Sequence, residues 1–296
     1  MKNFWLTCCG TLLIAATAGS EVLGQSPLAS GAKLVKLADG FLFTEGPTAD
    51  AEGNVYFTDQ PNNRIHRWSV DGVLSVFLEP AGRANGLCSD LQGSLWACAD
   101  ERNELWRIDL TTKTHQIIVK DYEQKLLNGP NDVWVRPDGG LYFTDPYFKR
   151  PYWTRGPSEQ DGAYVYFLSH DRKVLKRVTG PIRPNGVVGT PDGRTLYVAS
   201  GEIRAYDIEA DGSLSHERTF CEGPADGLTL DSDGNLYLAA RGVAIHDARG
   251  RLLDTIEVPE RWTANVCFGG RERKTLFITA SRGLYAIETR IPGSPQ

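Results

Sequence analysis

The sequence lacks several features that would assign it to a common class of protein. Its 32 Lys and Arg residues form no basic stripe and the net charge is −5, which argues against nucleic acid binding, since that needs clustered positive charge. The Gly-x-Ser-x-Gly motif is absent, which argues against a serine hydrolase. Helical periodicity is almost absent as well, so an all-β protein is the expected class.

Cysteines are few and do not form a metal-binding pattern. Cys8 and Cys9 lie in an N-terminal apolar run, and the other four are widely spaced at Cys88, Cys98, Cys221 and Cys267. This spacing matches no zinc motif. We expect four free, mostly buried thiols, with a Cys88–Cys98 disulfide as the alternative, because both flank one predicted hairpin.

The N-terminus has the pattern of a secretory signal peptide. An apolar run over 4–18 follows Lys2 and ends in a small-x-small pattern at 16–18. The run is too short to span a bilayer, which takes about 20 residues. We therefore expect a signal peptide over 1–24, a spacer over 25–32, and export to the periplasm or medium with no membrane attachment after cleavage. An uncleaved anchor or a misassigned start codon is the alternative.

A repeat of about 40 residues is the main signal in the sequence. Each copy has a polar opening, a strand, a turn with Asp or Gly, and a second strand with an aromatic residue. These aromatics are Tyr56, Trp96, Tyr142, Tyr197, Tyr237 and Phe277, at intervals of 40, 46, 55, 40 and 40 residues. Such a period with strand–turn–strand content is typical of propeller blades.

Six copies predict an all-β fold, a six-bladed β-propeller over 33–290 with a tail at 291–296. The last copy is followed by only one more predicted strand. We expect residues 33–37 to supply the outer strand of the last blade, because an N-terminal strand that joins it closes the ring and removes an open sheet edge.

A polar residue stands 11 or 12 positions before each repeat aromatic. These six ring positions are Glu45, Asn85, Asn131, Asn185, Asp226 and Asn265. The first strand of each blade lines the central channel, so the six side chains should converge at its mouth. Two acids and four amides form an oxygen cage suited to a hard cation, and no histidine occupies a ring position. The alternative is that Asn-Gly and Asp-Gly are simple turn chemistry.

The longest repeat interval contains an insertion at the same face. The second strand of each blade returns to the face where the first began, so Asp59, Asp100 and Asp145 should lie beside the ring. An aromatic and basic segment over 146–156 follows Asp145. We expect it to form a lid or a substrate wall that includes Tyr147. A surface loop packed by its own aromatics is the alternative.

These motifs together resemble the gluconolactonase, senescence-marker-protein and luciferin-regenerating-enzyme family over about 33–289. The segments that carry the resemblance are Thr44-Glu45-Gly46-Pro47, Ala84-Asn85-Gly86-Leu87, Asn128-Gly129-Pro130-Asn131-Asp132-Val133, Tyr142-Phe143-Thr144-Asp145-Pro146, Pro184-Asn185-Gly186 and Ala225-Asp226-Gly227-Leu228. The resemblance implies a six-bladed propeller with a divalent metal at the tunnel mouth.

The resemblance also implies roles for single residues. Glu45, Asn185 and Asp226 match the metal ligands, Asn131 matches a residue that contacts substrate or metal, and Asp226 also matches the proton-transfer residue. Animal members carry Arg where this chain has Gly129, so the resemblance does not extend to their sugar-acid specificity.

The expected function is metal-dependent opening of a small sugar lactone. Asp226, or as second choice Asp132, would take a proton from the attacking water, and Asn85, Asn131, Asp132 and Tyr147 would contact the substrate. The expected cofactor is one divalent cation, calcium first and magnesium, manganese or zinc otherwise.

Two other functions stay open. One is a phosphotriesterase similar to diisopropyl-fluorophosphatase on the same metal site, and the other is a non-enzymatic propeller that binds a ligand or partner. The small lactone is the only partner we expect, and the protein should be a monomer or a weak homo-oligomer.

Overall fold

The structure, a computed structural model, describes Met1 and residues 25–295. The predicted signal peptide falls almost wholly outside these residues. The described residues form 26 strands and two short 3₁₀ turns, η1 (Gln60–Asn62) and η2 (Asp100–Arg102). Among them, no helix has the length and apolarity needed to span a membrane. The predicted all-β class is confirmed.

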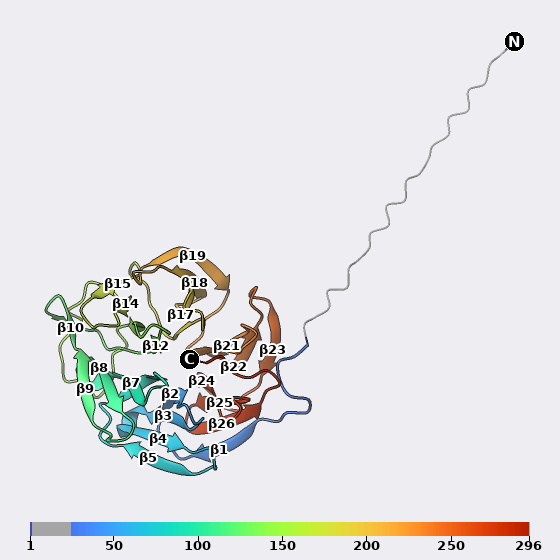
Figure 1. Cartoon of the computed structure of the whole chain (residues 1–296), viewed down its shortest axis with the longest axis horizontal. Coiled ribbons are helices and arrows are strands. Elements are labelled where there is room, and N and C mark those ends of the chain that lie inside the picture. The colour runs from blue at the N-terminus through green and yellow to red at the C-terminus, as the bar shows by residue number, and fades with distance from the viewer. Residues whose placement is uncertain (2–24, 296) are drawn as a thin grey trace.

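Six four-stranded antiparallel sheets surround a central axis as the blades of a propeller (Figure 1). Blades 1 to 3 contain β2 (Thr44–Ala49), β3 (Val55–Asp59), β4 (Arg64–Trp68), β5 (Leu74–Leu78); β6 (Ala84–Ser89), β7 (Ser94–Ala99), β8 (Glu104–Asp109), β9 (His115–Val119); and β12 (Val133–Val135), β13 (Leu141–Asp145), β14 (Tyr164–Leu168), β15 (Leu175–Arg177). A small hairpin, β10 (Asp121–Tyr122) and β11 (Lys125–Leu126), lies between blades 2 and 3 in the chain.

The remaining blades complete the ring. Blades 4 to 6 contain β16 (Val187–Gly189), β17 (Thr195–Ala199), β18 (Ile203–Ile208), β19 (Leu214–Cys221); β20 (Leu228–Leu230), β21 (Leu236–Ala240), β22 (Gly242–His246), β23 (Leu252–Ile256); and β24 (Thr263–Gly269), β25 (Thr275–Ala280), β26 (Gly283–Glu288), β1 (Val35–Asp39). Strand β1 pairs with β26, with Val35 opposite Ala286. The predicted closure is confirmed, with the strand beginning two residues later than expected.

The repeat aromatics pack between neighbouring blades. Trp96, Tyr142 and Tyr237 are fully buried, and Tyr237 of blade 5 meets Phe268 of blade 6 edge-on at 5.1 Å between ring centroids. Buried aromatic pairs of this kind stabilise the packing beyond the area that they bury. The four described cysteines are all free, so the alternative Cys88–Cys98 disulfide is wrong.

The blades come into backbone contact near the axis. The N–H of Gly86 donates to the carbonyl of Asn131 at 2.7 Å, and the N–H of Gly186 donates to the carbonyl of Asp226 at 2.8 Å. A Cβ on Gly186 would overlap that carbonyl, and Gly186 has no positive φ. Glycine is therefore required here for close approach between blades, and the turn-chemistry interpretation of these Asn-Gly pairs is wrong.

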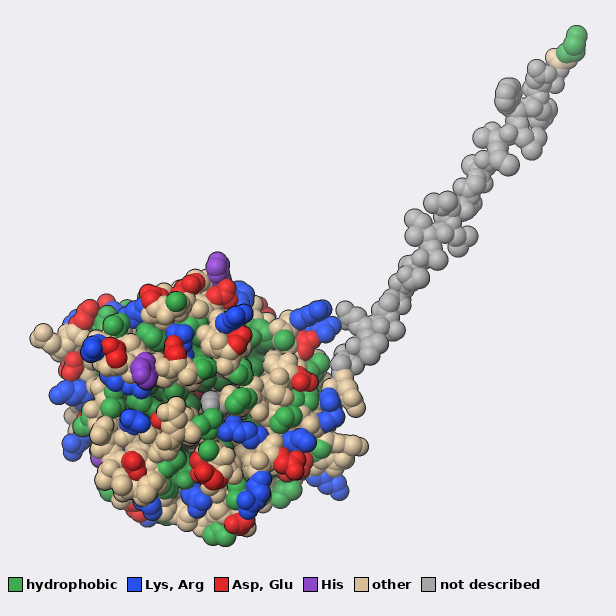
Figure 2. Space-filling model, viewed as in Figure 1, with side chains coloured by type: hydrophobic (Ala, Val, Ile, Leu, Met, Phe, Trp, Pro, Cys, Tyr) green, Lys and Arg blue, Asp and Glu red, His purple; other side chains and the backbone are tan. Residues whose placement is uncertain are grey.

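The chain's C-terminal residues lie at one end of the inner strands, opposite to the end where Asp226 lies. Ser294 donates through its N–H to Leu230 and through its hydroxyl to Asp231, at 3.0 and 2.6 Å. Both acceptors end the stretch that Asp226 begins, and the C-terminus lies close to the ring centre in Figure 1. Figure 2 shows acidic and basic side chains interspersed over the same view, with no patch of a single sign.

The glycine contact predicts a matched pair of substitutions. Gly186→Ala should lower the free energy of unfolding by roughly 1–3 kcal/mol, because the added methyl group must push two backbones apart. Gly180→Ala is the control, since a Cβ there meets nothing within 4 Å. Urea unfolding measures both, and equal stability of the two variants would contradict the close-approach role.

One buried histidine predicts a pH-dependent stability. His66 is 6% exposed, stacks on Phe57 at 5.3 Å between centroids, and neither ring nitrogen has a partner. Burial lowers the pKa of His66. The unfolded chain therefore binds a proton below a pH of about 6.5 while the folded protein does not, so this residue makes stability fall as the pH drops below that value.

His66→Phe should remove the part of the fall in stability below a pH of about 6.5 that this histidine causes. It should also raise the free energy of unfolding by about 1 kcal/mol at neutral pH, since two unpaired polar atoms disappear. Urea midpoints at several pH values between 5 and 8 measure the effect. A variant with the same stability and pH dependence as the parent protein would show that His66 is not buried in its neutral form.

Candidate functional site

The ring positions occupy equivalent places at one end of the inner strands. The N–H groups of Asn131, Asn185 and Asp226 donate to carbonyls that stand two residues after their repeat aromatics, Thr144, Ala199 and Ala239, at 2.9, 2.7 and 2.7 Å. Glu45 pairs with Thr58 and Asn265 with Thr279 at the same offset. The spacing of 11 or 12 residues before each repeat aromatic therefore identified structurally equivalent positions in these five blades.

Local irregularities help to place three of these side chains. The register shifts near Glu45 in β2, near Asn85 in β6, and near Asn265 in β24. Such bulges commonly re-aim side chains at the rims of sheets and beside active sites. Glu45 and Asn85 are each 3% exposed, Asn131 and Asn265 are also buried, and Asn185 and Asp226 are half-buried.

Two of the ring acids lie close enough to repel each other. The Glu45 carboxylate accepts the N–H of Gly46 at 3.0 Å. Burial raises its pKa well above the usual range, and the negative charge of Asp226 raises it further. Burial likewise raises the pKa of Asp226 to about 6, against hydrogen bonds from Trp262 and Asn185. The surroundings of both carboxyls therefore disfavour their charged forms, and a cation bound between them would favour ionisation.

Two amide atoms of the ring are buried without a partner. They are Asn185 Oδ1, an acceptor, and Asn85 Nδ2, a donor. In the part of the chain that the structure describes, no three His, Cys, Asp or Glu side chains are gathered for a metal ion. The ring instead combines two carboxylates with an unpaired amide oxygen, and this donor set fits a hard cation such as calcium.

Asp132 lies next to the ring and links blades. Its carboxylate accepts the N–H groups of Val133 and, from blade 4, Val187, at 3.0 and 3.1 Å. Burial raises its pKa to about 7. Asp132 and Asn265 line a cavity of about 20 Å³, which has room for one water molecule. Both carboxylate oxygens thus hold structural hydrogen bonds, which sequence reasoning did not anticipate.

The insertion after β13 is fastened to blade 2 through Asp100. The Asp100 carboxylate accepts the Tyr152 hydroxyl at 2.8 Å and Arg150 Nε at 3.2 Å, while Trp153 Nε1 donates to the Asp100 carbonyl at 3.1 Å. Arg150 also lowers the pKa values of Glu45 and Asp226. The insertion therefore brings a cation toward the two ring acids.

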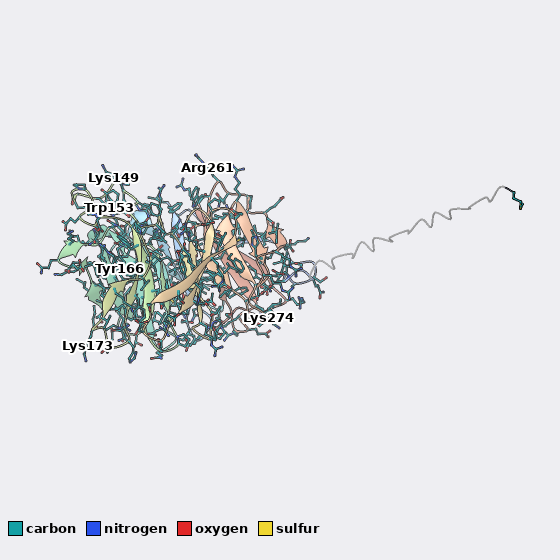
Figure 3. All side chains as sticks on the ribbon, turned by 90° about the horizontal axis from the view of Figure 1, so that it is seen from above. Lys149, Trp153, Tyr166, Lys173, Arg261 and Lys274 are labelled. Carbon is teal, nitrogen blue, oxygen red and sulfur yellow. The ribbon has the colours of Figure 1, made fainter. Side chains whose placement is uncertain are left out.

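Tyr147 belongs to an aromatic stack within the insertion. Its ring lies 5.6 Å from that of Trp153, and the Arg155 guanidinium packs 3.6 Å from the Trp153 ring. Arg155 also donates to the carbonyl of Asn128. Figure 3 shows Trp153 and Lys149 on one face of the disc and Lys173 and Lys274 on the other. The segment is both packed by its own aromatics and tied to the ring face, which leaves the substrate role of Tyr147 a prediction.

Two of the predicted acids at the ends of the second strands bind the backbone that leads into the ring positions. Asp145 accepts the N–H groups of Asn128 and Gly129, both at 2.8 Å. Asp59 does the same for Leu42 and Phe43 in blade 1. These carboxylates fix the backbone two and three residues before Asn131 and Glu45, so their task is to position the ring.

Sequence reasoning missed Trp262. Its Nε1 donates to Asp226 Oδ2 at 2.7 Å, across 36 residues of chain. It stands three residues before Asn265, where the other copies carry unrelated residue types, so no repeat signal could identify it.

Three known proteins are similar in sequence over most of this chain. Gluconolactonase of Zymomonas mobilis is 31% identical over 295 residues, covering 87% of this chain and 81% of that protein. Pentonolactonase XacC of Haloferax volcanii is 29% identical, covering 81% of each. Diisopropyl-fluorophosphatase of Loligo vulgaris is 25% identical, covering 82% of this chain and 87% of that protein.

A solved structure has the same fold at similar identity. The gluconolactonase XC5397 of Xanthomonas campestris superposes with a TM-score of 0.83 and 31% identity, covering 90% of this chain and 92% of that one. The family model described as the SMP-30/Gluconolactonase/LRE-like region matches residues 43–282, most of the chain. The protein therefore belongs to the SMP-30/gluconolactonase/LRE-like family.

Proposed function

We propose that this protein is a metal-dependent lactonase that opens a small sugar lactone at the tunnel mouth. The observation that carries the proposal is the pair of neighbouring ring acids, Glu45 and Asp226, together with the unpaired amide oxygen of Asn185. Similarity to gluconolactonase and pentonolactonase supports lactone hydrolysis as the reaction class.

A divalent cation would be held by Glu45, Asn185 and Asp226, with Asn131 beside them. When bound, it would supply Lewis acidity toward the lactone carbonyl. Calcium is the first choice, because carboxylate and amide oxygens are its usual ligands. Magnesium, manganese and zinc remain as outcomes of a binding test.

The chain's own groups would handle the proton and the substrate. Asp226 would accept a proton from the attacking water. The buried Nδ2 of Asn85 has no acceptor in the protein, and an oxygen of the bound substrate would satisfy it, because a buried donor without a partner is unfavourable. Asn131 would contact the substrate or the cation, as its place in the ring suggests.

Similarity to diisopropyl-fluorophosphatase supports a second candidate, hydrolysis of a phosphotriester at the same site. A phosphoryl oxygen and a lactone carbonyl make similar demands on a ring of oxygen ligands, so the ring does not separate the two. A substrate panel does.

Asp226→Asn should lower kcat for aldonolactone hydrolysis by about 10²–10⁴-fold, the range typical for removal of a general base, with the melting temperature kept near that of the parent protein. Proton release measures the rate. Glu272→Gln, an exposed acid in the turn at the opposite end of the inner strands, is the control and should keep full activity.

Full activity of the Asp226→Asn variant would exclude the proposed base. Cation-dependent cleavage of phosphofluoridates without lactone hydrolysis would favour the second candidate. A parent protein that turns over neither substrate would leave a binding propeller as the remaining function.

Calcium added to the chelated protein should raise its melting temperature by several degrees, since a ligand at about 100 times its Kd stabilises the folded state by about 2.7 kcal/mol. Glu45→Gln should abolish that increase. In chelator, the same variant should be at least as stable as the parent, because it removes the repulsion with Asp226. Differential scanning calorimetry measures all four samples, and no response to any of the four cations would contradict a metal site.

A further inference from the structure

Trp262 is an exposed aromatic side chain whose backbone is held in place. It immediately precedes β24, and the residue is 52% exposed. Its N–H donates to Ser281 Oγ at 3.2 Å, and the Ser281 hydroxyl donates back to the Trp262 carbonyl at 3.3 Å. Ser281 lies between β25 and β26, so two neighbouring segments of blade 6 fix this residue.

The indole is also held, by the ring residue of the neighbouring blade 5. Trp262 Nε1 donates to Asp226 Oδ2 at 2.7 Å, which fixes the ring plane beside the acid. Leu252 is equally exposed at 53% but lies on the outer strand β23 and has no such tie. Figure 3 shows the adjacent Arg261 on the same face of the disc as Trp153. Trp262 is therefore a fixed and exposed apolar surface beside the ring acid Asp226.

We propose that Trp262 has two tasks in the reaction, and this inference rests on the proposed lactonase function. Its hydrogen bond to Oδ2 makes it a positioning residue for Asp226, and its exposed ring is a platform for the C–H face of the sugar lactone. An aromatic ring has a negative face, which attracts the weakly positive C–H groups of a sugar ring. An outer hydrogen bond of this kind orients a functional carboxylate in the same way as it orients a metal ligand.

The exposure of the ring argues against a purely structural role. A tryptophan that serves the core buries most of its surface, whereas Trp262 leaves about half of its surface in solvent. Asp226 also receives a hydrogen bond from Asn185, so the Trp262 bond is not needed simply to pair that carboxylate. What Trp262 adds is a fixed direction for one oxygen and an apolar surface beside it.

Two substitutions separate the tasks. Trp262→Phe keeps an aromatic face and loses the donor, so kcat should fall by roughly 10-fold or more, as for other orienting partners, with KM little changed. Trp262→Gln keeps an N–H donor and loses the ring, so KM for aldonolactones should rise several-fold and kcat should change less. Leu252→Ala is the control for loss of an exposed apolar side chain and should keep both constants.

A binding measurement complements the kinetics. Titration with an aldonate, the product of the proposed reaction, should quench tryptophan fluorescence in the parent protein, and this change should be lost in Trp262→Phe. Isothermal titration calorimetry, which does not depend on the indole, should show that aldonate affinity falls further in Trp262→Gln than in Trp262→Phe. Unchanged kcat and KM in both variants would overturn the inference while leaving the lactonase function intact.

A parent protein that hydrolyses no lactone would overturn the proposed function itself. The titration would then decide on Trp262 separately. Aldonate quenching that depends on Trp262 would keep the platform as a sugar-binding surface, and absence of that quenching would remove it.

Discussion

The close approach of the inner strands around one axis is the constraint on which the site depends. Gly86 and Gly186 donate their N–H groups directly to the carbonyls of Asn131 and Asp226 in the next blade. A side chain at either glycine would overlap the neighbouring backbone. Asn85 and Asn185 immediately precede these glycines, and Asn131 and Asp226 supply the carbonyls. Two blades therefore fix the backbone at each of these four ring positions.

A second consequence of this packing is electrostatic. Burial and the negative charge of Asp226 both disfavour ionisation of Glu45, and burial disfavours ionisation of Asp226. Arg150 lies near both, but its Nε is engaged by Asp100. The fold therefore maintains two acids whose charges the protein's own cations offset only in part, an arrangement that is unfavourable for stability and suited to a site that binds positive charge.

Other carboxylates around Glu45 and Asp226 have different tasks. Asp59 and Asp145 each accept two backbone N–H groups from the segment that enters the ring, and Asp132 joins blades 3 and 4. Asp100 instead holds the insertion through Arg150 and Tyr152. Carboxylates at one face thus divide into those that could meet a ligand and those that fix the backbone around it, a division that depends on which donors lie within reach.

The sequence by itself determined the blade count, the closing strand and the six ring positions. Strand alternation, turn residues and the spacing from Glu45 to Tyr56 or from Asp226 to Tyr237 are local properties, so they can be read along the chain. Only the tertiary structure decided the role of Gly186, the tie from Trp262 to Asp226, and the anchoring of the insertion. These depend on contacts across 36 or 50 residues of chain, between blades whose approach no single repeat encodes.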